Sequence, residues 1–170
     1  MAEPTPPPAP WVHKDVIVDA SPIAGQGLFA HAALDTGTVV IRLGGRVVTT
    51  SELEQLLRDS ERYVDTITVF IDTHLVLAPV TSVHYGNHSC DPSLWHVGPY
   101  EIATRRPLKA GEELTIDYAT HSGAPGFSMD CSCGTSECRG VVTSEDWRHP
   151  ELQTRYAGHW VPALAARIAE

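Results

Sequence analysis

The chain has 170 residues, a hydrophobic content of 42% and a formal net charge of −9. That length suits a single domain with a core of its own, and no stretch is long and apolar enough to span a membrane. The acidic balance argues against a protein that wraps nucleic acid through a basic, phosphate-binding surface. The acidity either attracts a basic partner, such as a lysine-rich peptide, or only keeps the protein soluble.

The chain is expected to begin with a proline-rich, disordered lead over residues 1–10. This lead has no apolar segment typical of a secretory signal, so we expect an intracellular protein. Order should start near Trp11. Two strands are then predicted, at residues 12–18 and 38–43, because both stretches are rich in β-branched residues and are followed by glycine or proline turns.

One helix interrupts these strands. Ser51 with Glu54 three residues later predicts a capping box, and Leu53, Leu56 and Leu57 supply an apolar stripe at helical spacing. The helix should end near Ser60.

Strands are predicted to dominate the chain again up to Tyr118. The expected ranges are 63–71 and 74–78 around an Asp72-Thr73 turn, then 100–105 and 113–118 around Lys109-Ala110-Gly111. From Ser144 onward the pattern predicts short helices, opening at 144–146, 150–157 and 162–169, that pack on the preceding cysteine-rich segment. The whole is a mainly β chain with a helical C-terminal tail.

The four cysteines carry the strongest chemical signal. Cys131, Cys133 and Cys138 form a C-x-C-x4-C cluster, and Cys90 closes the stretch Asn87-His88-Ser89-Cys90. Four thiolates make one closed tetrahedral zinc site, which would join the two segments. Two disulfides or unrelated buried thiols are the alternatives, although Cys131 and Cys133 are too close in sequence to serve independent bridges comfortably.

Four stretches, in this order, resemble the SET-domain lysine methyltransferases with a post-SET zinc-binding segment. They are Gly25-Gln26-Gly27-Leu28-Phe29, Asn87-His88-Ser89-Cys90-Asp91-Pro92, Gly111-Glu112-Glu113-Leu114-Thr115-Ile116-Asp117-Tyr118, and Cys131-Ser132-Cys133 with Cys138-Arg139-Gly140. Each stretch alone is weak evidence, but the order and spacing together are specific. The similarity runs from about Val12 to Val142.

The resemblance implies a β-clip, SET-like fold of several small β-sheets with a knot-like crossing that brings Asn87 and His88 beside Tyr118. It implies a SET domain over residues 11–120, a post-SET zinc-binding segment over 121–142 and a helical tail over 143–170. It also implies transfer of a methyl group from S-adenosylmethionine to a lysine ε-amine of a protein such as a histone. The zinc would be structural.

The site residues carry over from the same motifs. Tyr118 matches the catalytic tyrosine of the family. The implied cofactor-binding residues are Gly25, Gln26, Gly27, Leu28, Tyr85, Asn87 and His88, with Asn87 and His88 offering amide and imidazole hydrogen bonds. The zinc ligands are Cys90, Cys131, Cys133 and Cys138.

Several positions depart from the family pattern, among them three in or beside the motifs. Ile116 stands two residues before Tyr118, where members commonly carry phenylalanine or tyrosine, and its lack of a hydroxyl predicts di- or trimethyl-lysine as product. Ser93 replaces the usual asparagine, and Val141 stands where an aromatic residue often covers the cofactor.

Two other functions are weighed against the enzyme. One is a catalytically silent, zinc-stabilised SET-like module that only binds basic peptides, and the other is a plain zinc-stabilised interaction domain. The expected partner is a lysine-containing protein or peptide, with no direct nucleic-acid or membrane binding. The oligomeric state, the source, and a cytoplasmic rather than a nuclear location cannot be read from this chain.

Overall fold

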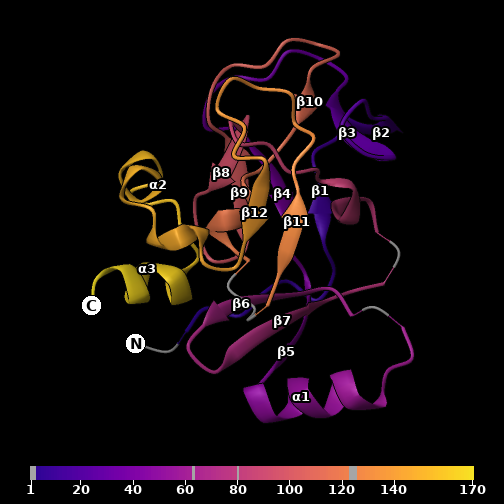
Figure 1. The fold of residues 1–170 in the computed structure, drawn as a ribbon. Coiled ribbons are helices and arrows are strands. Elements are labelled where there is room, and N and C mark those ends of the chain that lie inside the picture. The colour runs from indigo at the N-terminus through magenta and orange to yellow at the C-terminus, as the bar shows by residue number, and fades with distance from the viewer. Residues whose placement is uncertain (1–2, 63, 80, 123–125) are drawn as a thin grey trace.

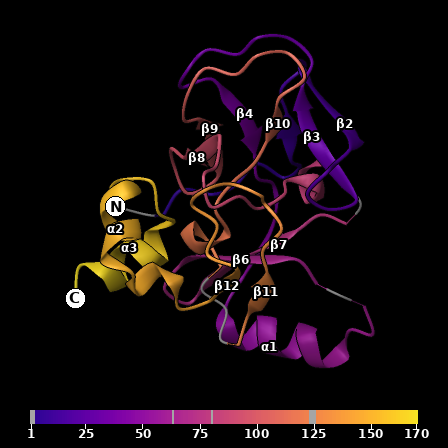
Figure 2. The same ribbon diagram turned by 45° about the horizontal axis from the view of Figure 1, so that its top comes forward.

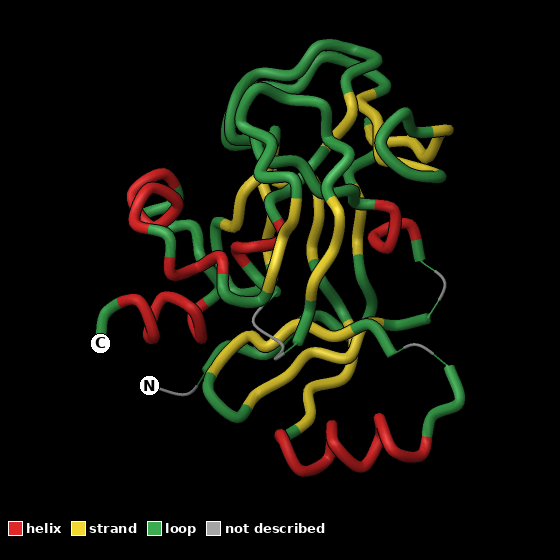
Figure 3. The backbone as a smooth tube through the Cα atoms, viewed as in Figure 1, coloured by secondary structure: helices red, strands yellow, loops and turns green. Residues whose placement is uncertain are grey.

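The computed structural model describes residues 3–62, 64–79, 81–122 and 126–170. Over these residues the strands form four small sheets with short helices around them, as Figures 1 and 3 show. The prediction of a mainly β chain built from several small sheets is therefore confirmed. No helix among the described residues is long and apolar enough to cross a membrane.

All the strand pairs within these sheets are antiparallel. The largest sheet has the order β1-β4-β9-β8, made of β1 (Trp11–Val12), β4 (Val39–Arg42), β9 (Glu101–Thr104) and β8 (Leu94–His96). A second has the order β10-β3-β2, from β10 (Glu113–Leu114), β3 (Gln26–Ala30) and β2 (Val16–Ala20). A third has the order β5-β7-β6, from β5 (Gly45–Val48), β7 (Thr73–Leu77) and β6 (Thr66–Phe70). The last pairs β11 (Ser128–Asp130) with β12 (Val141–Thr143).

The helices are short. They are α1 (Thr50–Asp59), η1 (Ser82–Tyr85), η2 (Tyr118–Thr120), η3 (Asp146–Arg148), α2 (Pro150–Arg155) and α3 (Pro162–Ile168). Figures 1 and 2 both show α1 on the outer side of the β5-β7-β6 sheet, and α2 and α3 together on another flank of the molecule. The predicted helical tail is present, and its Tyr156, Trp160 and Leu164 are buried in the core.

A crossing between distant parts of the chain positions the site. His88 forms an isolated parallel bridge with Ile116. The amide of Ile116 donates to the carbonyl of Asn87 at 3.1 Å, and the amide of Ser89 donates to the carbonyl of Ile116 at 3.1 Å. The predicted neighbourhood of Asn87, His88 and Tyr118 is therefore present.

The helix α1 starts two residues earlier than predicted. Thr49 is its N-cap and forms the capping box with Glu52, so the proposed pair of Ser51 and Glu54 is wrong. The side chain of Asp72 fixes this start, because it accepts a hydrogen bond from the amide of Thr50 at 3.0 Å. The predicted end near Ser60 is confirmed, since Ser60 is the C-cap.

Other strands also differ in extent from the prediction. The predicted strand 113–118 is reduced to β10, because Asp117 accepts from the amide of Ala119 and turns the chain into η2. Strands β3, β5, β8, β11 and β12 were not predicted. Tyr63, the predicted start of a strand, lies outside the described residues. The proline-rich residues 3–10 form no helix or strand, but the carbonyl of Pro7 accepts from the amide of Gly45.

Candidate functional site

The four cysteines meet at one point of the fold. Their Sγ atoms all lie within 4.8 Å of one another, and those of Cys90 and Cys131 are 3.7 Å apart. A tetrahedron with zinc–sulfur bonds of about 2.3 Å has edges of about 3.8 Å, so this spacing fits a closed zinc site. All four are free thiols, and 3.7 Å is far beyond a disulfide bond of about 2.05 Å. The disulfide alternative is therefore excluded in this structure.

Two hydrogen bonds orient the sulfur of Cys90. The amide of Arg139 donates to it at 3.3 Å, and the Nε2 atom of His88 lies 3.3 Å from it. The amide of Tyr118 donates to Nδ1 of His88 at 3.1 Å, so the proton of the neutral ring must be on Nε2 and point at the sulfur. Burial lowers the pKa of His88, which keeps this ring neutral. Such donors stabilise a metal-bound thiolate.

A buried ion-pair network lies directly behind this cluster. Arg139 donates two hydrogen bonds to Asp117, at 2.7 and 2.8 Å, and a third from Nε to Asp146 at 3.0 Å. The hydroxyl of Tyr156 also donates to Asp117, at 3.0 Å. Burial alone would raise the pKa of Asp117, but the hydrogen bonds and charge of Arg139 lower it below its ordinary value. Arg139 therefore joins the cysteine segment, the helical tail and the residue before Tyr118.

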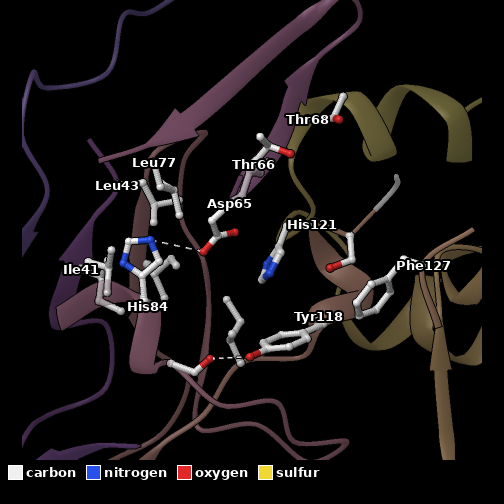
Figure 4. Close-up of a pocket in the computed structure, with 16 residues that line it drawn as sticks. Ile41, Leu43, Asp65, Thr66, Thr68, Leu77, His84, Tyr118, His121 and Phe127 are labelled. Atoms are coloured by element: carbon white, nitrogen blue, oxygen red, sulfur yellow. Dashed lines mark hydrogen bonds and ion pairs between the residues drawn. The ribbon is translucent and has the colours of Figure 1, made fainter. Parts of the chain in front are cut away.

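Tyr118 lies between two cavities. One cavity, of about 320 Å³, is lined by Tyr118 together with residues of β4, β6, β7, β9 and η1. The other, of about 80 Å³, is lined by Tyr118, Asn87 and His88 with residues of the 21–26 turn and of β11. The Tyr118 hydroxyl donates to the carbonyl of Gly86 at 2.8 Å, which fixes the position of the ring (Figure 4). A group bound in either cavity therefore contacts the same side chain.

The smaller cavity is shaped by Asn87. Its amide nitrogen donates to Ser21 and Glu113 side chains and to the carbonyls of Ala24 and Gln26, at 2.8 to 3.2 Å. Its Oδ1 atom accepts no hydrogen bond from any described residue, so this oxygen is available to a ligand. Asn87 thus holds the turn that forms one wall of the cavity.

His88 lines the same cavity, and its ring is hydrogen-bonded to other residues of the protein. Both ring nitrogens already have partners, in Tyr118 and Cys90, and the residue is 3% exposed. In this structure the imidazole contacts the cysteine cluster and the amide of Tyr118. Among the described residues, nothing forms a hydrogen bond with the backbone N–H or C=O of His88.

Gly25 and Gly27 of the glycine motif shape the turn but do not line the cavity. Gly25 has φ +50°, which favours glycine, and a Cβ on Gly27 would collide with the carboxylate of Glu113. That carboxylate accepts from Ser21 at 2.8 Å and from Asn87 at 2.8 Å. Gly27 therefore leaves room for the contacts that close the turn.

Five of the predicted cofactor residues do not line either cavity. Leu28 is completely buried in the core, Tyr85 packs partly buried against it, and Gln26 contributes its carbonyl to Asn87. Gly25 and Gly27 act through the turn. Instead Ile23 and Ala24, which precede the motif, are in the cavity wall.

The larger cavity is mostly apolar with a few polar groups. Its apolar lining includes Ile41, Leu43, Ile67, Leu77, Val83, Ile102, Ile116 and Phe127. Polar groups come from Asp65, His84 and His121, labelled in Figure 4, and the Nε2 atom of His84 lies 3.5 Å from the carboxylate of Asp65. Burial raises the pKa of Asp65. This cavity suits an extended aliphatic chain that ends in a polar group.

Several residues of the site were missed in the sequence. Asp117, Arg139 and Tyr156 form the buried network, and Asp65 and His121 line the larger cavity. Asp117 and Arg139 both belong to the motifs quoted above, where they are adjacent to Tyr118 and Cys138. Their positions in these motifs could have marked them as site residues. Nothing in the local pattern distinguishes Asp65, His121 or Tyr156.

The sequence pattern described as "SET domain" matches residues 25–119. Among curated proteins, the chain is 28% identical over 155 residues to histone-lysine N-methyltransferase ash1 of Drosophila melanogaster. It is 33% identical over 154 residues to histone H3-lysine(4) N-trimethyltransferase ATX1 of Arabidopsis thaliana. It is 28% identical over 149 residues to histone-lysine N-methyltransferase SUV39H2 of Gallus gallus.

These matches cover 82%, 82% and 69% of this chain. They span only 7%, 14% and 37% of the three relatives. Among solved structures, the methyltransferase domain of human histone-lysine N-methyltransferase SETMAR superposes with a TM-score of 0.59 at 19% identity, covering 76% of this chain and 57% of that one. At that identity the likeness concerns the fold.

Proposed function

We propose that this chain, which belongs to the SET-domain family, transfers a methyl group from S-adenosylmethionine to a lysine ε-amine of a protein. The observation that carries the proposal is the position of Tyr118, which lines two cavities of different character. Methyl transfer is an in-line displacement, so donor and acceptor must approach the reacting carbon from opposite sides. Two cavities that share Tyr118 would bring donor and acceptor to the same residue.

The smaller cavity is the proposed end of the cofactor site. The free Oδ1 of Asn87 and the unpaired backbone groups of His88 would hydrogen-bond the cofactor, and Ile23, Ala24 and Met129 would contact its apolar parts. At about 80 Å³ the cavity is smaller than the roughly 300–1,000 Å³ of pockets that enclose a whole ligand, so it would receive only one end of it. The bound cofactor supplies an electrophilic methyl group on a sulfonium.

The larger cavity is the proposed channel for the target lysine. Its apolar walls suit the four methylenes of the side chain, and Tyr118 is one of its lining residues. A lysine must lose its proton before it can attack, and desolvation in an apolar channel lowers the pKa of the ammonium group. The hydroxyl of Tyr118, fixed by Gly86, would orient the reacting groups.

The cysteine cluster is the proposed structural zinc site. Four protein thiolates leave no open coordination position, so the metal would take no part in the transfer. It would fix the 121–142 segment, the proposed post-SET region, against the 11–120 SET domain, while residues 143–170 form the docked tail. Through His88 and Arg139, the metal site would also hold Tyr118 in place.

The proposed substrate is a lysine-rich protein such as a histone. The net charge of −9 favours encounter with a basic protein, and the three relatives are named as histone-lysine methyltransferases. A silent peptide-binding module would keep the cysteine cluster without needing a cofactor site.

Calorimetric titration of the zinc-loaded protein with S-adenosylmethionine separates the two functions. The enzyme should bind the cofactor and then label a pool of core histones in the same tube. Histone binding with neither cofactor binding nor transfer would contradict the proposal and favour the silent module. Bovine serum albumin serves as an acidic control substrate.

A further inference from the structure

A histidine that the proposed mechanism leaves unused stands beside Tyr118. His121 lines the larger cavity, and its ring centroid lies 5.5 Å from that of Tyr118 (Figure 4). Its Nδ1 atom is 3.2 Å from Nε2 of His96, a residue only 1% exposed. Because His96 takes Nδ1, the one ring nitrogen of His121 left for a ligand is Nε2. No described residue hydrogen-bonds to that Nε2.

Nε2 of His96 faces Nδ1 of His121, whereas Nδ1 of His96 has no hydrogen-bond partner among the described residues. One of the two facing nitrogens donates and the other accepts. When Nδ1–H of His121 donates to Nε2 of His96, Nε2 of His121 carries a lone pair, and this is the tautomer on which the proposal below depends.

Both rings are uncharged at neutral pH. Burial, with a smaller contribution from the charge of His121, lowers the pKa of His96 to about 3. Burial also lowers the pKa of His121 to about 4. A group so weakly basic does not take the proton of a lysine ammonium, but it still accepts a hydrogen bond.

We propose that Nε2 of His121 accepts a hydrogen bond from the ε-amine of the target lysine, which makes His121 a determinant of how many methyl groups are added. The proposal rests on the methyl transfer proposed above. Ile116 lines the same cavity and has no polar atom for this purpose. His121 provides the polar contact that Ile116 lacks.

The contact depends on the methylation state of the amine. A lysine that has lost its proton to water carries two N–H bonds and one lone pair. One N–H donates to His121, and the lone pair attacks the methyl carbon as the carbon–sulfur bond breaks, moving the positive charge from sulfur to nitrogen. The product then loses a proton to water. A neutral dimethyl-lysine has no N–H, so His121 does not orient it.

Substitution of His121 tests this in the full-length, zinc-loaded protein. His121→Phe should lower kcat/KM for an unmethylated lysine peptide about tenfold, the usual effect of one hydrogen bond of about 1.4 kcal/mol. The same variant should leave kcat/KM for the dimethyl-lysine peptide within a factor of two of wild type, because that amine has no N–H and makes no hydrogen bond to His121 that the substitution could remove. His121→Gln, which restores an acceptor, should recover most of the loss. The matched control is His31→Phe, because His31 is exposed and lines neither cavity.

If the role of His121 is only structural, His121→Phe should lower kcat/KM for the unmethylated and the dimethyl-lysine peptide equally. That result would overturn the proposal. A readout without turnover uses protein labelled with ¹⁵N-histidine and titrated with n-butylamine as a lysine analogue. The proposal predicts an Nδ1-protonated His121 whose Nε2 signal shifts with butylamine, and an unshifted signal would contradict it. If that shift occurs in a protein without transfer activity, the amine contact stands and the proposed methyl transfer fails.

Discussion

The guanidinium of Arg139 donates two hydrogen bonds to Asp117, the residue immediately before Tyr118. Arg139 itself follows the cysteine Cys138 and donates its amide to the sulfur of Cys90. Asp117 is completely buried, and the side chain of Arg139 is 14% exposed. One residue therefore links the cysteine cluster to the segment that carries the proposed catalytic tyrosine.

Breaking the ion pair between Arg139 and Asp117 should lower the stability of the protein. Arg139→Met leaves the Asp117 carboxylate buried without its cation, which typically destabilises a protein by about 3–5 kcal/mol. Arg105→Met is the matched control, because Arg105 pairs with Asp91 at 3.0 Å where the Asp91 side chain is 57% exposed, and such pairs contribute about 0–1 kcal/mol. Urea unfolding measures the loss of stability in both variants. Equal losses in the two variants would contradict a structural role for the buried pair.

Each of the four cysteines should be required for zinc binding. Cys90→Ser, Cys131→Ser, Cys133→Ser and Cys138→Ser should each lower the metal content, because a closed site needs every thiolate. Ser136→Ala, in the same loop but exposed, is the control and should retain one zinc per chain. Elemental analysis of the purified variants measures this. Full zinc retention in any one cysteine variant would remove that residue from the site.

Gly27→Ala should destabilise the protein through Glu113. The added Cβ would meet the Glu113 carboxylate and force it away from Ser21 and Asn87, an overpacking cost of typically 1–3 kcal/mol. Gly98→Ala is the control, because a Cβ there meets nothing within 4 Å. In thermal unfolding, adding Glu113→Ala to Gly27→Ala should recover part of the loss. No recovery would show that the cost has another origin.

The buried histidine pair should make stability fall in mild acid. His96 and His121 have pKa values of about 3 and 4 in the folded protein, against 6.5 for the unfolded chain. Between these limits the unfolded state binds protons that the folded state does not, so stability is complete above pH 6.5 and decreases toward pH 4. Two such rings give a slope of about 2.7 kcal/mol per pH unit.

Unfolding titrations at several pH values between these limits test the histidine pair. The double variant His96→Gln/His121→Gln should flatten the slope, whereas His31→Gln should leave it as in wild type. An unchanged slope in the double variant would assign the acid sensitivity to other groups, such as the cysteine cluster.

The motifs predicted that the four cysteines gather at one point and that Asn87, His88 and Tyr118 are neighbours, but the contacts between these residues required the fold. Asp117 and Arg139 lie 22 residues apart, and no local rule pairs two charged residues at that separation. The family resemblance implies a cofactor contact for the ring of His88. Its burial against Cys90 arises from the crossing with Ile116, which is a long-range contact.

The start of α1 also depends on a long-range contact that the local sequence does not reveal. Thr49, Thr50 and Ser51 are followed by Glu52 and Glu54, so two overlapping capping boxes are possible from the local sequence. Asp72 decides between them by accepting from Thr50, and it is distant in sequence. Strands β8 and β11, of three residues each, are too short to show a period.

Tyr118→Phe tests the central claim most directly. The change removes only the hydroxyl that donates to Gly86 between the two cavities. Mass spectrometry of core histones incubated with S-adenosylmethionine should show methyl-lysine with the wild-type protein and almost none with Tyr118→Phe, while calorimetry and elemental analysis show unchanged cofactor binding and zinc content. Equal methylation by a folded Tyr118→Phe variant would contradict a catalytic role for this tyrosine.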